Sequence, residues 1–320
     1  MSFKKKITII LSLILAFVLF DVSAYNLFTK RYIDTRGKEL KNRSIEVSEY
    51  LPFTEDSKIC HVESGVELSG DLPVIDGAAA LYPMFSAFVD SAYPEGCVNF
   101  DGEDFTNDSV LQFHNTRGAY KAVVDGDADI IFCAKPSDEQ LEYAAENGVE
   151  LAMIPIGYEA FVFIVGNSNP VNNLTVEQIQ GLYTGKYKNW SEVGGDNRLV
   201  DAVQRNAGSG SQTAMLSFMN GQPMQRSFLG ALSGRAIGYS FRYYVEGLNK
   251  NPNVKMLSVN GFYPNQENIA NGDYPLASSF YAIYDLSNDN ENIPLMIDFI
   301  LSTDGQKIVE ESGYIPITGK

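Results

Sequence analysis

The chain has 320 residues, with 24 Lys and Arg against 40 Asp and Glu, and its formal net charge is −16. This charge argues against nucleic acids and anionic membrane surfaces as partners, but a small anion can still bind where backbone N–H groups and one arginine converge. The length allows two domains with a substantial core, and a composition of 45% hydrophobic and 20% charged residues is that of an ordinary globular protein.

The N-terminus has the pattern of an export signal. Lys4, Lys5 and Lys6 precede an uncharged run from Ile7 to Phe20, and small residues follow at Ser23-Ala24. A basic start, an apolar run and a small-residue site predict a signal peptide over residues 1–24, or a membrane anchor through residues 7–28. We therefore expect an exported protein at the extracellular face of the membrane or in the periplasm. Residues 25–70 are polar and mixed in charge, which favours a tether or peripheral segment.

Cysteine and histidine are scarce and scattered. Cys133 lies in an apolar run and is typical of a small core residue, whereas Cys60 and Cys97 could form a disulfide or remain two free thiols. His61 and His114 are the only histidines. The spacing of these residues fits no zinc site, and we expect neither a metal nor a cofactor.

From residue 72 onward, strands and helices alternate. Residues 72–77 read as a buried strand that ends in a turn, and a helix follows from Ala79 to Val89. Asn115 opens a helix through Val124, and a strand over residues 128–133 comes next. Ser137 is a good N-cap for a helix over residues 139–147. Short strands are also expected at 98–100 and 110–113.

Two apolar, strand-forming runs in the second half are long enough to pass between lobes. One extends from Leu151 to Val165, and the other, rich in aromatic residues, from Leu276 to Tyr284. Helices are predicted between and after them, at 174–183, 213–219, 241–248 and 294–311. The alternation predicts an α/β protein with parallel or mixed sheets that helices cover on both faces.

The turn from Arg205 to Thr213, which reads RNAGSGSQT, has the chemistry of an oxyanion receptor. It follows a short apolar run at residues 199–203 and precedes the helix predicted at 213–219. Glycine lets the backbone approach a ligand closely, and a helix N-terminus contributes N–H groups and a positive dipole. Ser209 and Ser211 add hydroxyl donors, and Arg205 adds a planar, permanently charged fork. The alternative is an ordinary strand-to-helix turn capped by Ser211.

Two further turns at helix starts carry features of the same kind. Asn115-Thr116-Arg117-Gly118 is polar, whereas the turn at residues 77–80 has alanines at 78, 79 and 80 and offers only backbone N–H groups. In open α/β sheets, ligands bind beyond the carboxyl ends of strands, where helix N-termini converge. The three turns are expected there.

Several segments together resemble the phosphate ABC-transporter substrate-binding proteins, a family with the two-lobed, class II periplasmic-binding-protein fold. The resemblance spans roughly residues 72–318. The segments that carry it are Asp76–Leu81, Gly126–Ile131, Asn169–Val171, Ile179–Gly195, Arg205–Ser211, Ala236–Tyr239 and Gly272–Leu276. The resemblance implies two α/β lobes joined by two crossing strands. Residues 71–157 plus 272–320 would form lobe I, and residues 158–271 would form lobe II.

The resemblance also implies where an anion binds. Arg205, Ser209, Gly210 and Ser211 match the family's anion-binding turn, with Ser211 where threonine is usual. Asn115 or Thr116 stands near the serine of the second turn.

The first turn and the end of the next strand depart from the family. Ala78 and Ala79 replace hydroxyl residues, so that Ala79 and Ala80 could contribute only N–H groups. Lys135 follows Ala134 where Ser-Arg or Ser-Asp is usual; it would offer donors alone, without the carboxylate that accepts the proton of phosphate and repels sulfate. The alternative for Lys135 is a solvent-facing residue before Pro136.

The resemblance implies a protein that captures inorganic phosphate, or a similar oxyanion, for uptake through an ABC-transporter permease. The alternative is a membrane-anchored sensing or surface-binding module of the same fold, without a transport role. We expect a monomer and no enzyme, because the sequence around Ser209 does not match the Gly-x-Ser-x-Gly nucleophile elbow.

Overall fold

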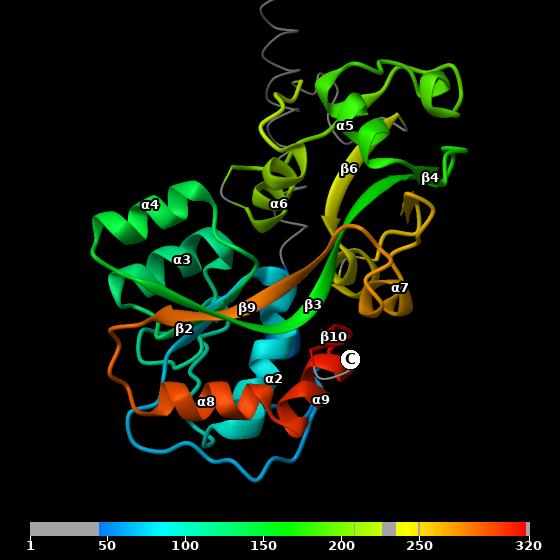
Figure 1. The fold of residues 1–320 in the computed structure, drawn as a ribbon. Helices are drawn as coiled ribbons and strands as arrows, with labels where there is room; N and C mark the ends of the chain where they lie inside the picture. Colours follow the sequence, from blue (N-terminus) through cyan, green and yellow to red (C-terminus); the bar gives the residue numbers. More distant parts are fainter. Residues whose placement is uncertain (1–44, 208, 226–234, 249, 318–320) are drawn as a thin grey trace, which may run out of the picture. The chain divides into compact units, whose positions relative to one another are not determined.

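The computed structural model describes residues 45–207, 209–225, 235–248 and 250–317 (Figure 1). The predicted signal peptide or anchor and most of the predicted tether lie outside these residues. Among the helices of the described part, none is long and apolar enough to span a membrane. Residues 1–44 and residues 45–320 form separate units, and the fold below is that of the second.

A mixed sheet runs through this unit in the order β1-β2-β9-β3-β6-β5. Parallel pairs join β1 to β2 and β5 to β6, whereas β9 pairs antiparallel with both β2 and β3. The strands of this path are β1 (Ile75–Gly77), β2 (Ile130–Cys133), β9 (Ala277–Asp285), β3 (Leu151–Gly166), β6 (Ala236–Phe241) and β5 (Asp201–Ala202). Two more strands, β7 (Val254–Met256) and β10 (Ile315–Pro316), pair with β3, and β4 (Asn173–Leu174) pairs with β8 (Ser258–Val259).

Helices lie on both sides of this path (Figure 1). The α-helices are α2 (Tyr82–Ala92), α3 (Asn115–Asp125), α4 (Asp138–Glu146), α5 (Val176–Thr184), α6 (Gly210–Met219), α7 (Gln266–Ala270), α8 (Asn292–Leu301) and α9 (Thr303–Glu311). Short 3-10 helices cover Val47–Tyr50, Ala79–Leu81 and Trp190–Val193, and a π-helix covers Tyr244–Leu248. The predicted α/β class with mixed sheets is confirmed.

One strand, β3, belongs to both halves of the fold. Its first part pairs with β9 as far as Ala160, and its second part pairs with β6 from Phe161 onward. Separate hydrophobic cores lie on either side of this change of partner. On one side, one core is built around α2, α8 and α9 and a smaller one around α3, β2 and α4; on the other side, a core is built around α5, α6 and β6. Figure 1 shows β3 and β9 crossing side by side from one half to the other.

Residues 45–70, which the sequence suggests are peripheral, pack along α2. Ile59, Val62 and Leu68 are buried in the same core as α2. The hydroxyl of Ser86 donates to the carbonyl of Tyr50 at 2.6 Å, and the N–H of Phe53 donates to Asp90 at 2.7 Å. This segment therefore covers part of the core that is built around α2.

A buried ion pair fixes the place where the strands cross. Glu159 on β3 and Arg242, which follows β6, are 4% and 6% exposed, and Nε of Arg242 lies 3.5 Å from the Glu159 carboxylate. The same carboxylate accepts backbone N–H bonds from Ala160 and Tyr243 at 2.8 and 3.1 Å. Arg242 also donates to the carbonyl of Gly313, just before β10. Three chain segments thus meet at one guanidinium.

We expect this pair to make stability pH-dependent. Burial raises the pKa of the Glu159 carboxyl to about 7, although Arg242 and two backbone N–H groups oppose the rise. The folded chain therefore holds this proton more tightly than the unfolded chain, where the pKa is near 4.5. As a result, this group's contribution to the free energy of unfolding is full below pH about 4.5 and is lost by about pH 7.

Glu159→Gln should remove that part of the pH dependence, and Glu267→Gln, on the exposed surface of α7, serves as the matched control. Urea unfolding between pH 4.5 and 7.5 measures both. Equal slopes for wild type and Glu159→Gln would contradict the assignment.

Candidate functional site

The Arg205 turn leads directly into helix α6. The helix begins at Gly210, three residues before the predicted start, because Ser209 caps it. The Ser209 hydroxyl accepts the N–H of Gln212 at 3.3 Å and donates to the carbonyl of Asn206 at 2.9 Å. The alternative that Ser211 is the cap is therefore wrong. The N–H groups of Gly210 and Ser211 belong to the first turn, where a helix supplies no acceptor of its own.

The backbone of Arg205 is held against α6 and β6. Its N–H lies 3.0 Å from the side-chain oxygen of Gln212 and 3.0 Å from the hydroxyl oxygen of Tyr239. Tyr239 in turn donates its hydroxyl to Gln212, and both side chains are buried. Burial raises the pKa of Tyr239 to about 12, so its hydroxyl stays neutral and remains a donor. The half-buried Arg205 side chain thus starts from a fixed backbone.

The predicted second turn lies against the first turn of α6. Asn115 opens α3 with a positive φ of 58°, and Thr116, one residue into the helix, is 8% exposed. A Cβ placed on Gly210 would lie 3.3 Å from Oγ1 of Thr116. Gly210 therefore permits a close approach that a larger residue would obstruct. The structure brings together two helix starts that are 94 positions apart in the chain, Thr116 and Gly210.

The start of α3 is tied to the end of β1 by a carboxylate. Asp76 is fully buried, and its Oδ1 accepts the N–H groups of Gly77 and His114 at 2.7 and 2.9 Å. Its Oδ2 lies 2.7 Å from Nδ1 of His114. No local pattern in the sequence joins Asp76 to His114, apart from the position of the aspartate at the end of a buried strand.

The first turn and Lys135 follow neighbouring strands. β1 and β2 are parallel, with Gly77 opposite Phe132, so residues 78–80 and 134–135 leave the sheet at the same edge. The N–H of Ala78 donates to the carbonyl of Phe132 at 2.9 Å and is already used. Ala79 and Ala80 form the first turn of a 3-10 helix, where N–H groups lack helical acceptors. Lys135 is exposed. Contact of these three residues with a ligand stays a prediction.

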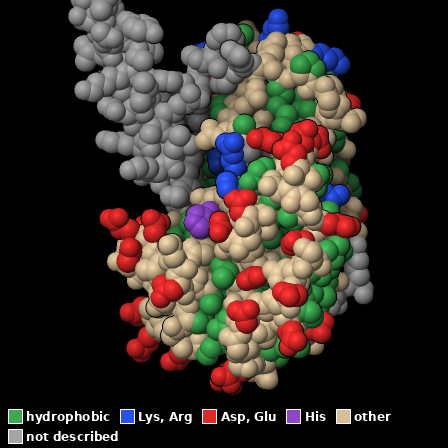
Figure 2. All heavy atoms as spheres, turned by 90° about the vertical axis from the view of Figure 1, so that its left-hand side faces the viewer, with side chains coloured by type: hydrophobic (Ala, Val, Ile, Leu, Met, Phe, Trp, Pro, Cys, Tyr) green, Lys and Arg blue, Asp and Glu red, His purple; other side chains and the backbone are tan. Residues whose placement is uncertain are grey.

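Charged side chains are unevenly distributed over the face of the molecule that Figure 2 shows. Figure 2 shows Lys, Arg and His side chains near the middle of the face that looks left in Figure 1, with one group of Asp and Glu beside them and further Asp and Glu over the lower part. Among the described residues, no group of three His, Cys, Asp or Glu could hold a metal ion. The thiols of Cys60, Cys97 and Cys133 are all free.

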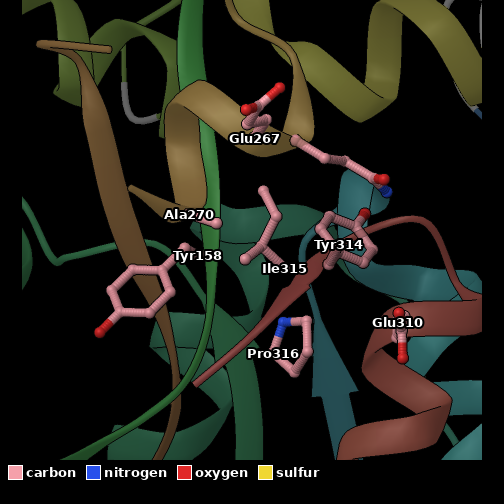
Figure 3. A pocket seen from close by; sticks show the side chains of 8 residues that line it. Tyr158, Glu267, Ala270, Glu310, Tyr314, Ile315 and Pro316 are labelled. Carbon is pink, nitrogen blue, oxygen red and sulfur yellow. The ribbon is translucent and has the colours of Figure 1, made fainter. Parts of the chain in front are cut away.

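A separate pocket of about 270 Å³ is lined by residues from β3, α7, α9 and β10 (Figure 3). Tyr158, Tyr314, Ile315 and Pro316 supply much of its wall, and Glu267 and Glu310 lie at its edge. None of the nine predicted ligand-binding residues lines it. It is therefore distinct from the place where α3 and α6 begin.

The cap of α6 can be tested by itself. Ser209→Ala should lower the free energy of unfolding by about 1 kcal/mol, because a helix N-cap hydroxyl is lost. Ser211→Ala, two residues later, removes no cap and should stay within about 0.5 kcal/mol of wild type. Denaturant unfolding without ligand distinguishes the two. A larger loss in Ser211→Ala than in Ser209→Ala would reverse the assignment.

Comparison with known proteins identifies similar chains. Two similar curated chains are phosphate-binding proteins PstS. That of Borreliella burgdorferi is 25% identical over 202 residues, covering 56% of this chain and 68% of the relative. That of Bacillus subtilis is 27% identical over 224 residues, covering 60% and 72%. These relatives confirm the resemblance to phosphate substrate-binding proteins.

A solved structure is similar over nearly its whole length. It is a putative phosphate ABC transporter substrate-binding protein with bound phosphate from Clostridium perfringens, with a TM-score of 0.58 and 24% identity, covering 79% of this chain and 99% of that one. At this identity the likeness shows the two-lobed fold. A sequence-family model, described as the PBP superfamily domain, matches residues 74–302, which are most of the chain. The chain therefore belongs to the PBP superfamily.

Proposed function

We propose that the protein captures inorganic phosphate, or a similar tetrahedral oxyanion, between its two lobes and delivers it to an ABC-transporter permease. The observation that carries this proposal is the approach of Thr116, at the start of α3, to Gly210, at the start of α6. Two helix N-termini that meet beside an arginine form a site with positive potential. The similarity to proteins named for phosphate binding supports the choice of anion.

The groups in this arrangement are hydrogen-bond donors. The N–H groups of Gly210 and Ser211 are unused by the helix ladder, Arg205 supplies a guanidinium, and Thr116 supplies a hydroxyl. Binding would be noncovalent, and closure of the lobes would exclude water and strengthen each charged hydrogen bond. Ala79, Ala80, Asn115, Lys135 and Ser209, whose hydroxyl also caps α6, complete the proposed set.

We infer binding without catalysis. The hydroxyl of Ser209 is held between the carbonyl of Asn206 and the N–H of Gln212, which suits a helix cap rather than a nucleophile. We further propose export to the outer face of the membrane, directed by the N-terminal signal or anchor.

Calorimetry on the full chain tests the ligand. Phosphate should give saturable heat with one site per chain, and sulfate and molybdate rank the selectivity. Absence of both heat and a thermal shift with millimolar phosphate would contradict the proposal.

Growth of a deletion strain tests the transport role. Loss of phosphate uptake supports delivery to a permease. Unchanged uptake by a strain whose protein binds phosphate in vitro would instead favour the anchored sensing module.

A further inference from the structure

His114 occupies the position immediately before α3, two residues from Thr116. Its side chain is 56% exposed, although its partner Asp76 is fully buried. Asp76 holds both the backbone N–H and Nδ1 of His114, at 2.9 and 2.7 Å. The ring is therefore fixed from the protein side, and Nε2 is the nitrogen that Asp76 does not engage.

The surroundings of His114 favour its charged form. The hydrogen bond that the His114 ring donates to Asp76 raises the pKa of His114, and the negative charges of Asp76, Asp104 and Asp127 raise it further, against the effect of partial burial. In the charged form both ring nitrogens carry a proton. The N–H at Nδ1 then donates to Asp76, and the N–H at Nε2 is a charged donor beside the start of α3.

We propose that His114 is a ligand-contacting residue of this site, whose imidazolium donates from Nε2 to the bound oxyanion. This inference rests on the proposed function and adds a charged donor that the family resemblance does not assign. The His114 donor would compensate for the first turn, which lacks hydroxyl donors because positions 78–80 are alanines. Asp76 is the positioning residue, because it orients the ring and keeps its charge.

The same geometry limits what the site can discriminate. Asp76 already accepts hydrogen bonds from the N–H groups of Gly77 and His114 and pairs with Nδ1 of His114. The other oxygen acceptors among the groups assigned to the ligand are neutral, namely the hydroxyls of Thr116, Ser209 and Ser211 and the amide of Asn115. Neutral oxygens repel a fully ionised oxyanion less than a carboxylate does, so we expect weaker selection for a protonated ligand than in a site with a free carboxylate.

Nuclear magnetic resonance can follow this histidine directly, because the chain has only two. The second, His61, is an internal control. Its Nδ1 lies 2.9 Å from Asp90, and its side chain is 54% exposed. His61 is therefore paired toward the far end of α2, because Asp90 lies eight residues after Tyr82 at the start of the helix, or about 12 Å along it.

The experiment titrates the ¹³Cε1–H resonances of the full chain, with and without saturating phosphate, after calorimetry has established saturation. We expect phosphate to raise the pKa of His114 by about 1 or more and to leave that of His61 unchanged. A rise of 1 corresponds to about tenfold tighter binding by the imidazolium than by the neutral ring. An unchanged His114 titration in the saturated protein overturns this inference and leaves the proposed function intact. If no phosphate binds at any pH, both fall together.

Two variants give an independent readout. His114→Gln should weaken phosphate binding about tenfold or more, because a charged donor is lost. His61→Gln should stay within about twofold of wild type. Thermal unfolding of both shows whether the His114 variant remains folded, and the titration of the wild-type chain decides the question if it does not. Equal affinity of a folded His114→Gln variant and wild type contradicts the inference.

Discussion

Arg205→Ala should weaken phosphate binding by about tenfold to a hundredfold. A hydrogen bond to a charged group contributes about 1.5–3 kcal/mol, and the guanidinium is the one permanent charge in the turn that leads into α6. The fold should survive, since Arg205 is anchored through its backbone N–H to Gln212 and Tyr239. Calorimetry with phosphate measures the effect, and thermal unfolding without ligand checks the fold.

Arg198→Ala is the matched control for this variant. Arg198 lies in the same half of the chain and is exposed. The Arg198→Ala variant should bind phosphate with the same affinity as the wild-type chain. If the Arg205→Ala variant binds phosphate as tightly as the Arg198→Ala variant, the turn before α6 is not the ligand site.

Arg242→Met should be the most destabilising substitution considered, with a loss of about 3–5 kcal/mol in the free energy of unfolding. The substitution leaves the carboxylate of Glu159 buried without its counter-charge. It also removes the bond from Arg242 to the carbonyl of Gly313 and the ion pair with Glu246 at 2.9 Å. Denaturant unfolding at pH 7.5, where Glu159 is mainly ionised, measures the full effect.

A second substitution tests the physical reason. Glu159→Gln combined with Arg242→Met removes both charges and should recover part of the lost stability. Arg198→Met controls for the loss of a surface arginine. If the double variant is as unstable as Arg242→Met alone, the unpaired carboxylate is not the cause of the loss.

Local sequence signals predicted the parts of the fold that depend on local chemistry. Ser137 caps α4 as predicted, through a capping box with a glutamine three residues later. Thr175 caps α5 in the same way. The two long apolar runs are the crossing strands β3 and β9, whose buried residues include Val162 and Phe163 on β3 and Phe280 and Ala282 on β9.

Other expectations were wrong where tertiary contacts decide the local structure. The predicted strands at 98–100 and 110–113 form only isolated bridges, Phe100 with Phe105 and Leu111 with Ile75. Their apolar side chains pack against the core instead of joining a longer ladder. The helix predicted at 241–248 forms over residues 242–248, but its Tyr244–Leu248 part is a π-helix and not the α-helix that was expected. Tyr243 directs its N–H to Glu159, a residue 84 positions away that no local pattern indicates.

The candidate site was predictable in part. The sequence of the Arg205 turn indicates its donors, but the cap at Ser209 depends on where the helix begins. The approach of Thr116 to Gly210 and the pair of Asp76 with His114 both join distant segments. Such pairs depend on tertiary packing and not on local sequence.

A crystal structure of the full chain with phosphate tests the central claim most directly. The account predicts a phosphate between the start of α3 and the start of α6, with the Arg205 guanidinium and the N–H groups of Gly210 and Ser211 on its oxygens. A phosphate bound elsewhere, such as in the pocket beside α7 and β10, with the α3 and α6 helix starts free of ligand, would contradict it.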